Sequence, residues 1–529
     1  MSETVKLYLP LLLIGLLVLR CTSTSEPPTA LDLSAVPLIP QPVSVTATGS
    51  SFRLTPETMI YTVGTSDELL RVGEHLSDYL TPATGFQLPV EATETDPEPG
   101  HVVLTLTADD NDLGEEGYVL TITEEQVQLT ARQPAGLFWG LQTLRQLLPA
   151  AIEGNDPQSG PWEIATGTIR DMPTYAYRGA MLDVARHFFG PDELKQYIDY
   201  LVRYKMNALH LHLSDDQGWR IEIKSWPKLA TYGGSTAVNG DPGGHYTQEQ
   251  YTDLVAYAQE RYVTIVPEID MPGHTNAALT SYPELNCDGK APELYTGIEV
   301  GFSTLCTDKE ITYKFVEDVM GELAAITPGP FLHIGGDESH ATAKEDYIPF
   351  VNRVQEIVQS HGKRVIGWDE IAEAAIVPNA VAQYWAEAEN AKLAVEQGAQ
   401  LIVSPATNAY LDMQYDSTTQ LGLHWAAYVE VDDAYQWEPT KLVEGVTQED
   451  ILGIEAPLWT ETITNMDELE YMVFPRLLGL AEIGWSPASV RDWESYKLRL
   501  GKQQDRFEVM DINYYASPLV PWSDSEVEE

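Results

Sequence analysis

The stretch GAMLDVARHFFGPDELKQYIDYLVRYKMNALHLHLSD, Gly179 to Asp215, sets the pattern for most of the chain. Two short apolar runs, 179–184 and 208–215, end in polar or charged residues and enclose a segment of helical character, 191–205. Six further runs follow: VTIVPEID (263–270), FLHIGGDE (331–338), RVIGWDE (364–370), VAQYW (381–385), QLIVSP (400–405) and GIEAPLW (453–459). Helical segments such as 247–261 separate them. Eight β-then-α units over about 280 residues predict a (β/α)8 TIM barrel, with catalytic groups at the C-terminal ends of the strands.

The segment ahead of the barrel has a different pattern. VVLTLTAD (102–109), GYVLTITEE (117–125) and QVQLTAR (126–132) alternate apolar and polar residues, which is typical of half-buried strands. GLFWGLQTLRQLL (136–148) has helical periodicity and should cover one face of their sheet. We therefore expect an α/β protein in which a smaller α+β domain, 37–170, precedes the barrel, 171–529.

The N-terminus indicates export. LYLPLLLIGLLVL (7–19) is one apolar run that is too short to span a membrane comfortably but fits the hydrophobic core of an export signal. Cys21 follows where a bacterial lipoprotein would be acylated, although Arg20 replaces the small residue that such signals carry. We expect an export signal over 1–21, with or without a lipid anchor on Cys21, and a polar tether over 22–36. The protein would be periplasmic, outer-membrane-anchored or secreted.

The charge of the chain excludes one class of partner. The 80 Asp and Glu residues exceed the 31 Lys and Arg residues and give a formal net charge of −49, which repels nucleic acid. Because 43% of the residues are hydrophobic and only 21% are charged, the chain can nevertheless build large cores. The acidic excess fits either the solvated surface of a secreted protein or an adaptation to high salt.

The remaining cysteines predict a structural bond and no metal site. Cys287 and Cys306 lie in a segment rich in Pro, Gly and Asn, and in an exported protein such a pair more often forms a disulfide than two free thiols. CxxC and HExxH spacings do not occur in the sequence, so we expect neither a metal nor another cofactor.

Adjacent carboxylates at the end of the fourth run are the strongest chemical signal. Asp337 and Glu338 close the run HIGGDE, behind two glycines that let a ligand approach the backbone. Side-by-side carboxylates repel, so the pKa of one should rise toward a value useful to a general acid. The plainer alternative is a carboxylate pair that only caps a helix.

Acids and aromatic residues also end the neighbouring runs. The acids are Asp215, Asp270 and Glu461, and the aromatic residues are Trp368, Trp385, Trp459 and Tyr410. His274, four residues after Asp270, is expected to join a proton-tuning network with these acids. A single Trp is more often core packing, but several at strand ends fit the walls against which the C–H faces of a sugar pack. Carboxylates, an arginine and Trp rings together indicate a glycoside hydrolase.

Five longer motifs carry a resemblance to a known family. They are RGAMLDVARHFF (178–189), LHLHLSDDQGWRIEI (209–223), PEIDMPGHTNAAL (267–279), LHIGGDESH (332–340) and EAPLWTET (455–462). Over 37–522 the chain resembles glycoside hydrolase family 20, the β-N-acetylhexosaminidases, and fits its bacterial chitobiase-like branch best. The resemblance implies a barrel paired with a non-catalytic α+β domain, as the patterns above predict.

The resemblance also implies a substrate-assisted mechanism, in which the 2-acetamido oxygen of the substrate attacks the anomeric carbon. Glu338 would act as acid and then base, Asp337 would accept the acetamide N–H, and Tyr410 would donate to the acetamide oxygen. The other implied roles are hydroxyl binding for Arg186, Asp412 and Glu461, enclosure of the acetamide methyl group for Trp368, Trp385 and Trp459, and tuning of Glu338 for Asp215, Asp270 and His274. Arg178 is an alternative sugar clamp, but its place before the first strand predicts a position at the barrel bottom.

The expected substrates are β-linked N-acetylhexosamine oligosaccharides such as chitobiose and chitooligosaccharides, cleaved at a terminal GlcNAc or GalNAc. Two alternatives stand beside this hypothesis. One is release of a disaccharide, as lacto-N-biosidases do, and the other is a non-catalytic lipoprotein that binds sugar. The sequence leaves the oligomeric state open.

Overall fold

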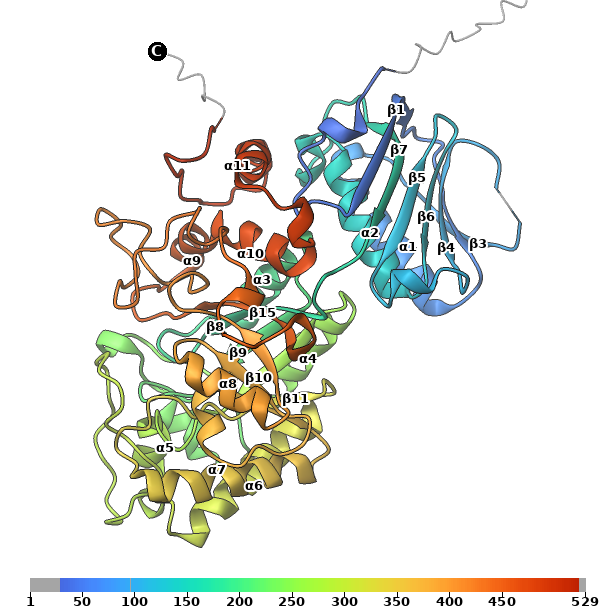
Figure 1. The fold of residues 1–529 in the computed structure, drawn as a ribbon. Coiled ribbons are helices and arrows are strands. Elements are labelled where there is room, and N and C mark those ends of the chain that lie inside the picture. Colours follow the sequence, from blue (N-terminus) through green and yellow to red (C-terminus); the bar gives the residue numbers. More distant parts are fainter. Residues whose placement is uncertain (1–28, 96, 523–529) are drawn as a thin grey trace, which may run out of the picture.

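The computed structural model describes residues 29–95 and 97–522 and consists of two parts, a sheet domain and a closed barrel (Figure 1). The predicted export signal, 1–21, and Cys21 lie outside the described residues. None of the helices within the described ranges is both long and apolar enough to cross a bilayer.

The N-terminal domain is built on a seven-stranded mixed sheet. Its strands are β1 (Ser44–Arg53), β2 (Ile60–Val63), β3 (Val90–Thr93), β4 (His101–Leu106), β5 (Tyr118–Ile122), β6 (Gln126–Ala131) and β7 (Glu163–Asp171), in the spatial order β1-β7-β5-β6-β4-β2-β3. Two helices, α1 (Asp67–Thr84) and α2 (Pro134–Leu147), pack on one face of this sheet. The period-two pattern buries Tyr118, Leu120 and Ile122 of β5, which confirms the predicted α+β domain.

The sheet domain begins before Pro37. Leu33, in a 3-10 turn over Leu33–Ala35, is 1% exposed and belongs to the hydrophobic core of the domain. The Leu33 side chain is therefore packed into the domain, whereas the side chains of a polar tether would lie in solvent. The tether expected over 22–36 therefore ends earlier than predicted.

The second part is the predicted barrel. Its strands are β8 (Tyr177–Asp183), β9 (Ala208–His212), β10 (Thr264–Glu268), β11 (Phe331–His333), β12 (Arg364–Trp368), β13 (Val381–Tyr384), β14 (Gln400–Val403) and β15 (Ile451–Leu458). All eight pair in parallel, and β15 pairs with β8 to close the barrel. Each strand overlaps one of the eight predicted runs, so the (β/α)8 prediction is confirmed.

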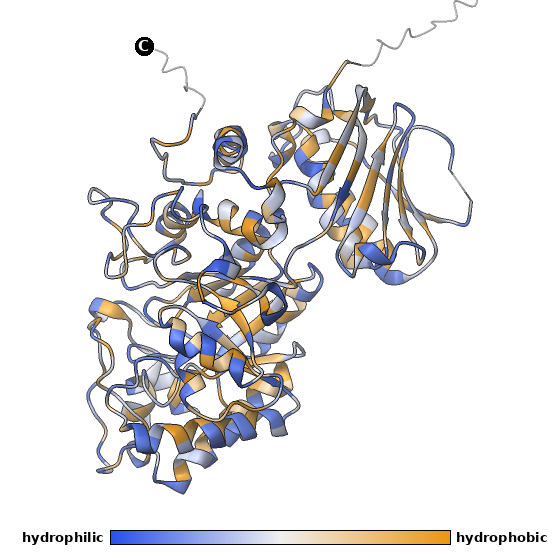
Figure 2. Cartoon of the chain, viewed as in Figure 1, coloured by the Kyte–Doolittle hydropathy of each residue, from blue (hydrophilic) through white to orange (hydrophobic). Residues whose placement is uncertain are grey.

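Helices surround the barrel strands. They are α3 (Pro191–Arg203), α4 (Gln248–Gln259), α5 (Asn276–Ser281), α6 (Glu310–Ile326), α7 (Lys344–Ser360), α8 (Ala388–Glu396), α9 (Met466–Val473) and α10 (Arg476–Trp485), followed by α11 (Trp493–Gly501) and α12 (Gln504–Val509). Figure 2 shows apolar strands inside and helices that carry hydrophilic residues on their outer sides. This is the distribution that burial of the strands between barrel interior and helices requires.

The barrel interior is apolar at one end of its axis and polar at the other. At the end where the strands begin, one apolar layer includes Tyr177, Val266 and Ile366. Toward the end where the strands finish, ionisable side chains such as His210 and Glu268 replace it, although both are fully buried. A barrel core of this kind is stable only if its polar groups satisfy one another.

The helical side of the sheet domain packs against the barrel where the strands begin. Arg178, at the start of β8, is fully buried, and its Nη2 lies 2.7 Å from Glu116 Oε1. Lys205 Nζ lies 2.8 Å from Asp171 Oδ2, and the Trp485 indole N–H donates to the same carboxylate. Arg178 therefore joins the two domains at the barrel bottom, as its position in the sequence predicts.

The predicted disulfide is present. Cys287 and Cys306 are bonded, with their Cα atoms 4.9 Å apart. The bond closes the loop that leads from α5 to α6.

Candidate active site

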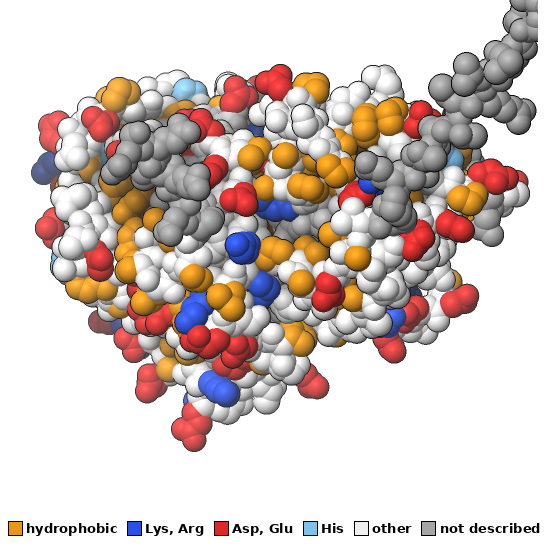
Figure 3. Space-filling view, turned by 90° about the horizontal axis from the view of Figure 1, so that it is seen from above, with side chains coloured by type: hydrophobic (Ala, Val, Ile, Leu, Met, Phe, Trp, Pro, Cys, Tyr) orange, Lys and Arg blue, Asp and Glu red, His pale blue; other side chains and the backbone are white. Residues whose placement is uncertain are grey.

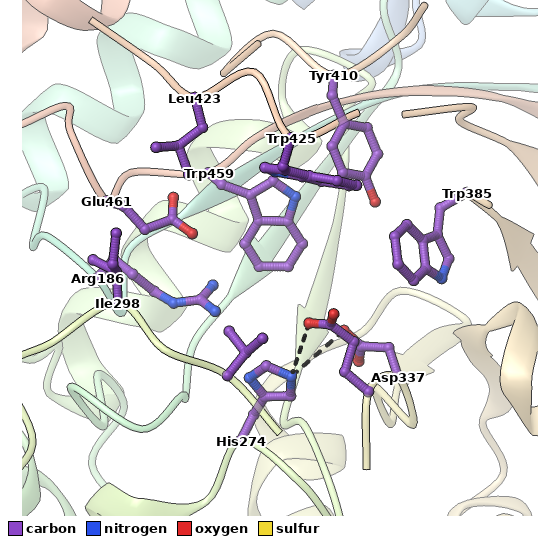
Figure 4. Close-up of a pocket in the computed structure, with 12 residues that line it drawn as sticks. Arg186, His274, Ile298, Asp337, Trp385, Tyr410, Leu423, Trp425, Trp459 and Glu461 are labelled. Carbon is purple, nitrogen blue, oxygen red and sulfur yellow. Dashed lines mark ion pairs between the residues drawn. The ribbon is translucent and has the colours of Figure 1, made fainter. Parts of the chain in front are cut away.

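All eight barrel strands contribute to one site at their C-terminal ends, and Figure 4 shows residues that line its cavity. In strand order these contributions are Arg186 after β8; Asp215 after β9; Asp270 and His274 after β10; Asp337 and Glu338 after β11; Trp368 at the end of β12; Trp385 after β13; Tyr410 and Asp412 after β14; and Trp459 and Glu461 after β15. Closure of the barrel brings together side chains that are up to 275 residues apart in the sequence (461 − 186).

These residues surround a cavity of about 320 Å³. Eight of the predicted residues line it directly: Arg186, His274, Asp337, Glu338, Trp385, Tyr410, Trp459 and Glu461. The other four predicted residues, Trp368, Asp215, Asp270 and Asp412, are buried behind this lining. The volume lies at the small end of the range for ligand pockets. Aromatic rings line one side of the cavity, between Glu461 and Asp337 (Figure 4).

The turn after β11 presents the two adjacent carboxylates. Gly335 and Gly336 have φ values of 64° and 106°, and a Cβ on Gly335 would lie 1.7 Å from Asp270 Oδ1. Only glycine therefore fits at position 335, and the freed space lets the Gly336 N–H donate to Asp270 Oδ1 at 3.0 Å. Glu338 also has a positive φ, 43°, which turns its side chain to the more open side of the cavity, where 31% of it is exposed.

Asp337 is the more buried member of the pair. Burial and the neighbouring charge of Asp270 raise the pKa of Asp337 well above its usual range, while His274 acts in the opposite direction. Among the described residues, Asp337 Oδ1 finds no hydrogen-bond partner although it is buried. The raised pKa expected for one of the adjacent carboxyls thus falls on Asp337, and this oxygen is free to accept from a ligand.

His274 links the carboxylate pair to a buried anion. Its Nε2 lies 3.8 Å from both Asp337 Oδ2 and Glu338 Oε2, the ion pairs drawn as dashed lines in Figure 4. Its Nδ1 lies 3.2 Å from Asp215 Oδ1. Burial opposes a charge on the imidazole, but Asp215 and Asp270 raise the pKa of His274 well above its usual value. The predicted network of Asp215, Asp270 and His274 therefore places a cation beside Asp337 and Glu338.

Arg186 is held in place before any ligand binds. Its Nη2 lies 2.8 Å from Asp215 Oδ2 and its Nη1 lies 3.4 Å from Asp183 Oδ2. The guanidinium also lies 4.8 Å from the ring centre of Trp459, within cation–π distance. Asp183 was not predicted as a site residue, although its position three residues before Arg186, at the end of a strand, was a usable signal.

Two acids remain available for polar ligand groups: Glu461, whose neighbouring charge is Arg186, and Asp412, whose neighbouring charge is Glu461. Both carboxylate oxygens of Asp412 are buried and without a hydrogen-bond partner among the described residues. Burial and the nearby Glu461 raise the pKa of Asp412 well above its usual value. Burial also raises the pKa of Glu461, partly offset by Arg186. Neutral hydroxyl groups are suitable partners for such acids, because they can both donate and accept.

Aromatic rings form the remaining walls. Trp385 and Tyr410 are near parallel, with ring centres 6.5 Å apart, and Trp459 lies 6.4 Å from Tyr410. Trp368 is 1% exposed and packs behind Trp459 at 5.8 Å, with its indole N–H donating to Glu268. Trp368 thus supports the wall from behind in this structure and does not form its surface.

Four apolar lining residues were not predicted. Ile298 and Val300 come from the disulfide-closed loop, and Leu423 and Trp425 come from the long loop after β14. Trp425 is 55% exposed and stands at the mouth, with its ring centre 5.9 Å from that of Trp385. These loops have no periodicity, so nothing in their sequences indicates where they cross the barrel.

Three site residues also resemble a cation-binding set. Asp270, His274 and Asp337 each place one ligand atom within 4.8 Å of the others. His274 and Asp337 already face one another as an ion pair, so the geometry is accounted for by acid–base contacts.

Comparison with known proteins agrees with this geometry. The family model described as "Glycosyl hydrolase family 20, catalytic domain" matches residues 175–488, and the one described as "Glycosyl hydrolase family 20, domain 2" matches residues 35–172. A β-N-acetylhexosaminidase of Cellulomonas fimi is 41% identical over 491 residues, which are 92% of this chain and 97% of that protein.

Solved structures lead to the same assignment. The GH20 β-N-acetylhexosaminidase of Streptomyces coelicolor A3(2) is 54% identical, with a TM-score of 0.89 over 92% of this chain and 99% of that one. A mutant Streptomyces plicatus β-hexosaminidase in complex with product GlcNAc is 53% identical, with a TM-score of 0.89 over 94% and 99% of the two chains. This chain therefore belongs to glycosyl hydrolase family 20 and is a β-N-acetylhexosaminidase.

Proposed function

We propose that this enzyme removes single terminal β-linked GlcNAc or GalNAc residues, with retention of configuration, by using the substrate's own acetamide as the nucleophile. The observation that carries the proposal is the unpaired, buried oxygen of Asp337 beside Glu338, at the bottom of an aromatic-walled cavity. An acetamide N–H is the kind of donor that this oxygen lacks. The rings of Trp385, Tyr410 and Trp459 surround the space that the acetamide methyl group would fill.

The first half-reaction forms one bond and breaks another. The acetamide oxygen attacks the anomeric carbon while the bond to the glycosidic oxygen breaks, and Glu338 transfers its proton to that leaving oxygen. Asp337 accepts the N–H and, in its ionised form, which the neighbouring His274 favours, stabilises the positive charge that develops on the resulting oxazolinium ion. Tyr410 donates to the acetamide oxygen and keeps it below the anomeric carbon.

The second half-reaction reverses these roles. Glu338, now ionised, accepts a proton from water as the water oxygen bonds to the anomeric carbon. The bond from that carbon to the acetamide oxygen breaks, and the acetamide is restored. Two inversions at one carbon give net retention. The positive charge of His274, 3.8 Å from Glu338, stabilises the carboxylate in this step.

The rest of the pocket favours exo action on a single sugar. Arg186 and Glu461 lie on the side of the cavity away from Asp337 (Figure 4), and the charge of Glu461 acts on Asp412 behind the lining. These three residues would bind the ring hydroxyls of a terminal residue. Chitobiose, chitooligosaccharides and glycoconjugates with terminal N-acetylhexosamine are the substrates that such a pocket fits.

Substrate specificity tests both the acetamide and the exo assignment. We expect cleavage of aryl β-GlcNAc and β-GalNAc glycosides and of chitobiose, and no appreciable cleavage of the matched aryl β-glucoside, which lacks the acetamide. Appreciable β-glucosidase activity would contradict substrate assistance. Product analysis should show monosaccharides only, and an intact disaccharide released from a lacto-N-biose conjugate would favour the lacto-N-biosidase alternative instead.

The Glu338→Gln variant tests the acid. Because glutamine is isosteric but carries no transferable proton, we expect kcat on chitobiose to fall by at least several hundredfold, within the roughly 10²–10⁴ range for general acid–base catalysis. Melting temperature and circular dichroism should match the wild type. Near-wild-type turnover would show that another group is the acid.

We further propose that the protein is exported, on the strength of the apolar run 7–19 and the disulfide between Cys287 and Cys306. Cell fractionation tests this, and loss of membrane association in Cys21→Ser would indicate a lipid anchor on Cys21. Equal distribution of both forms would argue for release without an anchor.

A further inference from the structure

A row of alternating carboxylates and imidazoles lies in the barrel interior beneath the cavity. His210 Nδ1 lies 2.9 Å from Glu455 Oε1, and its Nε2 lies 3.1 Å from Glu268 Oε2. His212, two residues further along β9, repeats the arrangement one level higher. Its Nδ1 lies 2.5 Å from Glu268 Oε2 and its Nε2 lies 2.9 Å from Asp215 Oδ2. All five side chains are buried, so solvent cannot take the place of any of these contacts.

The charges in this row alternate. Burial opposes a charge on His212, but Glu268 and Asp215 raise the pKa of its imidazole well above the usual value. Burial likewise opposes ionisation of Glu268, but His212 and His333 lower the pKa of that carboxyl well below its usual range. His212 is therefore an imidazolium that donates one N–H to each of two carboxylates.

Asp215 is the point where this row meets the active site. Its Oδ2 receives His212 Nε2 and Arg186 Nη2, and its Oδ1 receives His274 Nδ1 and the backbone N–H of Asp216. Four donors use the full acceptor capacity of a carboxylate, so the orientation of Asp215 is fixed by all of them together. Of the four donors, His212 is the one that lies within a barrel strand and continues the row to Glu268.

We propose that His212 is a positioning residue that holds Asp215 and, through it, sets both the sugar-binding Arg186 and the His274 that faces Glu338. His212 touches neither the cavity nor the substrate, so its effect on the reaction passes through Asp215. The inference rests on the proposed role of Glu338 as general acid. The experiment below distinguishes a wrong role for His212 from a wrong role for Glu338.

Two substitutions of His212 each keep one of its two hydrogen bonds and remove the other. An asparagine amide reaches about as far as Nδ1 and can still donate to Glu268, but not to Asp215. A glutamine amide reaches about as far as Nε2 and can still donate to Asp215. Both remove the same buried imidazole and its packing against Trp459, whose ring centre lies 4.9 Å away. The pair therefore isolates the link to Asp215.

The readout is kcat and KM on two aryl β-GlcNAc glycosides, one with a dinitrophenyl and one with an unsubstituted phenyl leaving group. The dinitrophenolate leaves without a proton, whereas phenol needs the general acid. We expect His212→Asn to lower kcat on the phenyl glycoside by about 10- to 100-fold, a part of what general acid catalysis supplies, with a much smaller loss on the dinitrophenyl glycoside. KM should rise on both substrates because Asp215, the partner of Arg186 at 2.8 Å, is no longer fixed by His212. His212→Gln should lose less than about fivefold on either substrate.

The matched control is His210→Asn, which removes the equivalent imidazole between Glu455 and Glu268 without touching Asp215. Its phenyl-to-dinitrophenyl activity ratio should stay near that of the wild type. This ratio does not depend on the fraction of folded enzyme, so a stability defect alone leaves it unchanged. If His212→Asn gives no soluble protein, Glu268→Gln replaces it and should change the ratio in the same direction.

Two results would overturn the inference: equal ratios in His212→Asn and His212→Gln, or a shift in His210→Asn as large as that in His212→Asn. Glu338→Gln is measured on the same substrates in parallel. A loss in that variant that does not depend on the leaving group would overturn the acid assignment itself, and the inference with it.

Discussion

At the scale of single residues, this site works by burying acids in places where their ionisation is costly. Burial, assisted by the charges of Glu268 and Asp215 and opposed by His274, raises the pKa of Asp270 to about 7. Asp270 Oδ1 accepts the Gly336 N–H, which it can do whether or not the carboxyl is ionised. This hydrogen bond holds the turn that carries Asp337. One buried acid thus couples the shape of the catalytic turn to its electrostatics.

Asp270 should make the stability of the enzyme depend on pH. Its pKa is about 7 in the folded protein and about 4 in the unfolded chain, so the folded state binds this proton more tightly. The stabilisation is present below about pH 4 and is lost as the pH rises through 7, by an amount on the order of a few kcal/mol. Asp270→Asn keeps the acceptor for Gly336 without this titration. Its melting temperature relative to the wild type should therefore be higher at pH 8 than at pH 5.

The control for that experiment is Asp505→Asn, on an exposed position of α12. Its melting temperature relative to the wild type should be the same at both pH values. An Asp270→Asn difference that is equally independent of pH would mean that Asp270 ionises without cost in the folded protein.

At the scale of elements, strands were predictable from the sequence and loops were not. Burial between the barrel interior and the helices demands short apolar runs, and this demand is visible at 208–215 and 331–338 without any knowledge of the fold. The polar and charged residues at the ends of these runs could also be predicted as site residues, because a barrel brings the ends of its strands together. Ile298 and Trp425 lie in loops whose paths are set by distant contacts, so local sequence carries no signal for them.

The polar barrel interior was missed although a signal existed. His210 and His212 are spaced by two residues in a predicted strand, and this spacing places both side chains on the same face. Two buried imidazoles on one face require acidic partners across the barrel, and Glu268 ends the neighbouring strand β10. A strand interpretation based on hydrophobicity alone treats such histidines as interruptions.

The disulfide-closed loop should affect both stability and substrate binding. Cys287–Cys306 encloses the segment that places Ile298 and Val300 on the cavity wall. In the double variant Cys287→Ser/Cys306→Ser, we expect a loss of up to about 3 kcal/mol in the free energy of unfolding. KM for an aryl β-GlcNAc glycoside should rise while kcat changes less, because the acid and its partners lie on other loops.

Denaturant unfolding and steady-state kinetics check this, with the wild type in reducing buffer as the matched comparison. A fall in kcat at constant KM would show that the loop acts on the chemical step instead.

At the scale of the whole molecule, the acidic excess is a property of the surface. On the face seen in Figure 3, Asp and Glu side chains are scattered widely among uncharged groups and do not gather into one patch. The buried acids of the site are a small share of the 80 acidic residues. Most of the net charge of −49 therefore comes from surface residues, which repel one another through solvent.

Salt should therefore stabilise the folded protein. Screening shortens the reach of this repulsion from about 10 Å at 0.1 M salt to about 3 Å at 1 M, so the melting temperature should be clearly higher in 1 M sodium chloride than in 0.1 M. Activity retained at the higher salt would favour the high-salt interpretation of the acidic surface. A melting temperature that falls with salt would show that attractive ion pairs, and not net repulsion, dominate.

The sheet domain packs at the end of the barrel opposite the cavity mouth. Arg178, Lys205 and Asp171 join the domains where the barrel strands begin, whereas the cavity opens where the strands end. The chain enters the described structure through the sheet domain, at the far side of the barrel from the cavity mouth. A polymer can thus approach the cavity mouth without crossing the sheet domain, however long the polymer is.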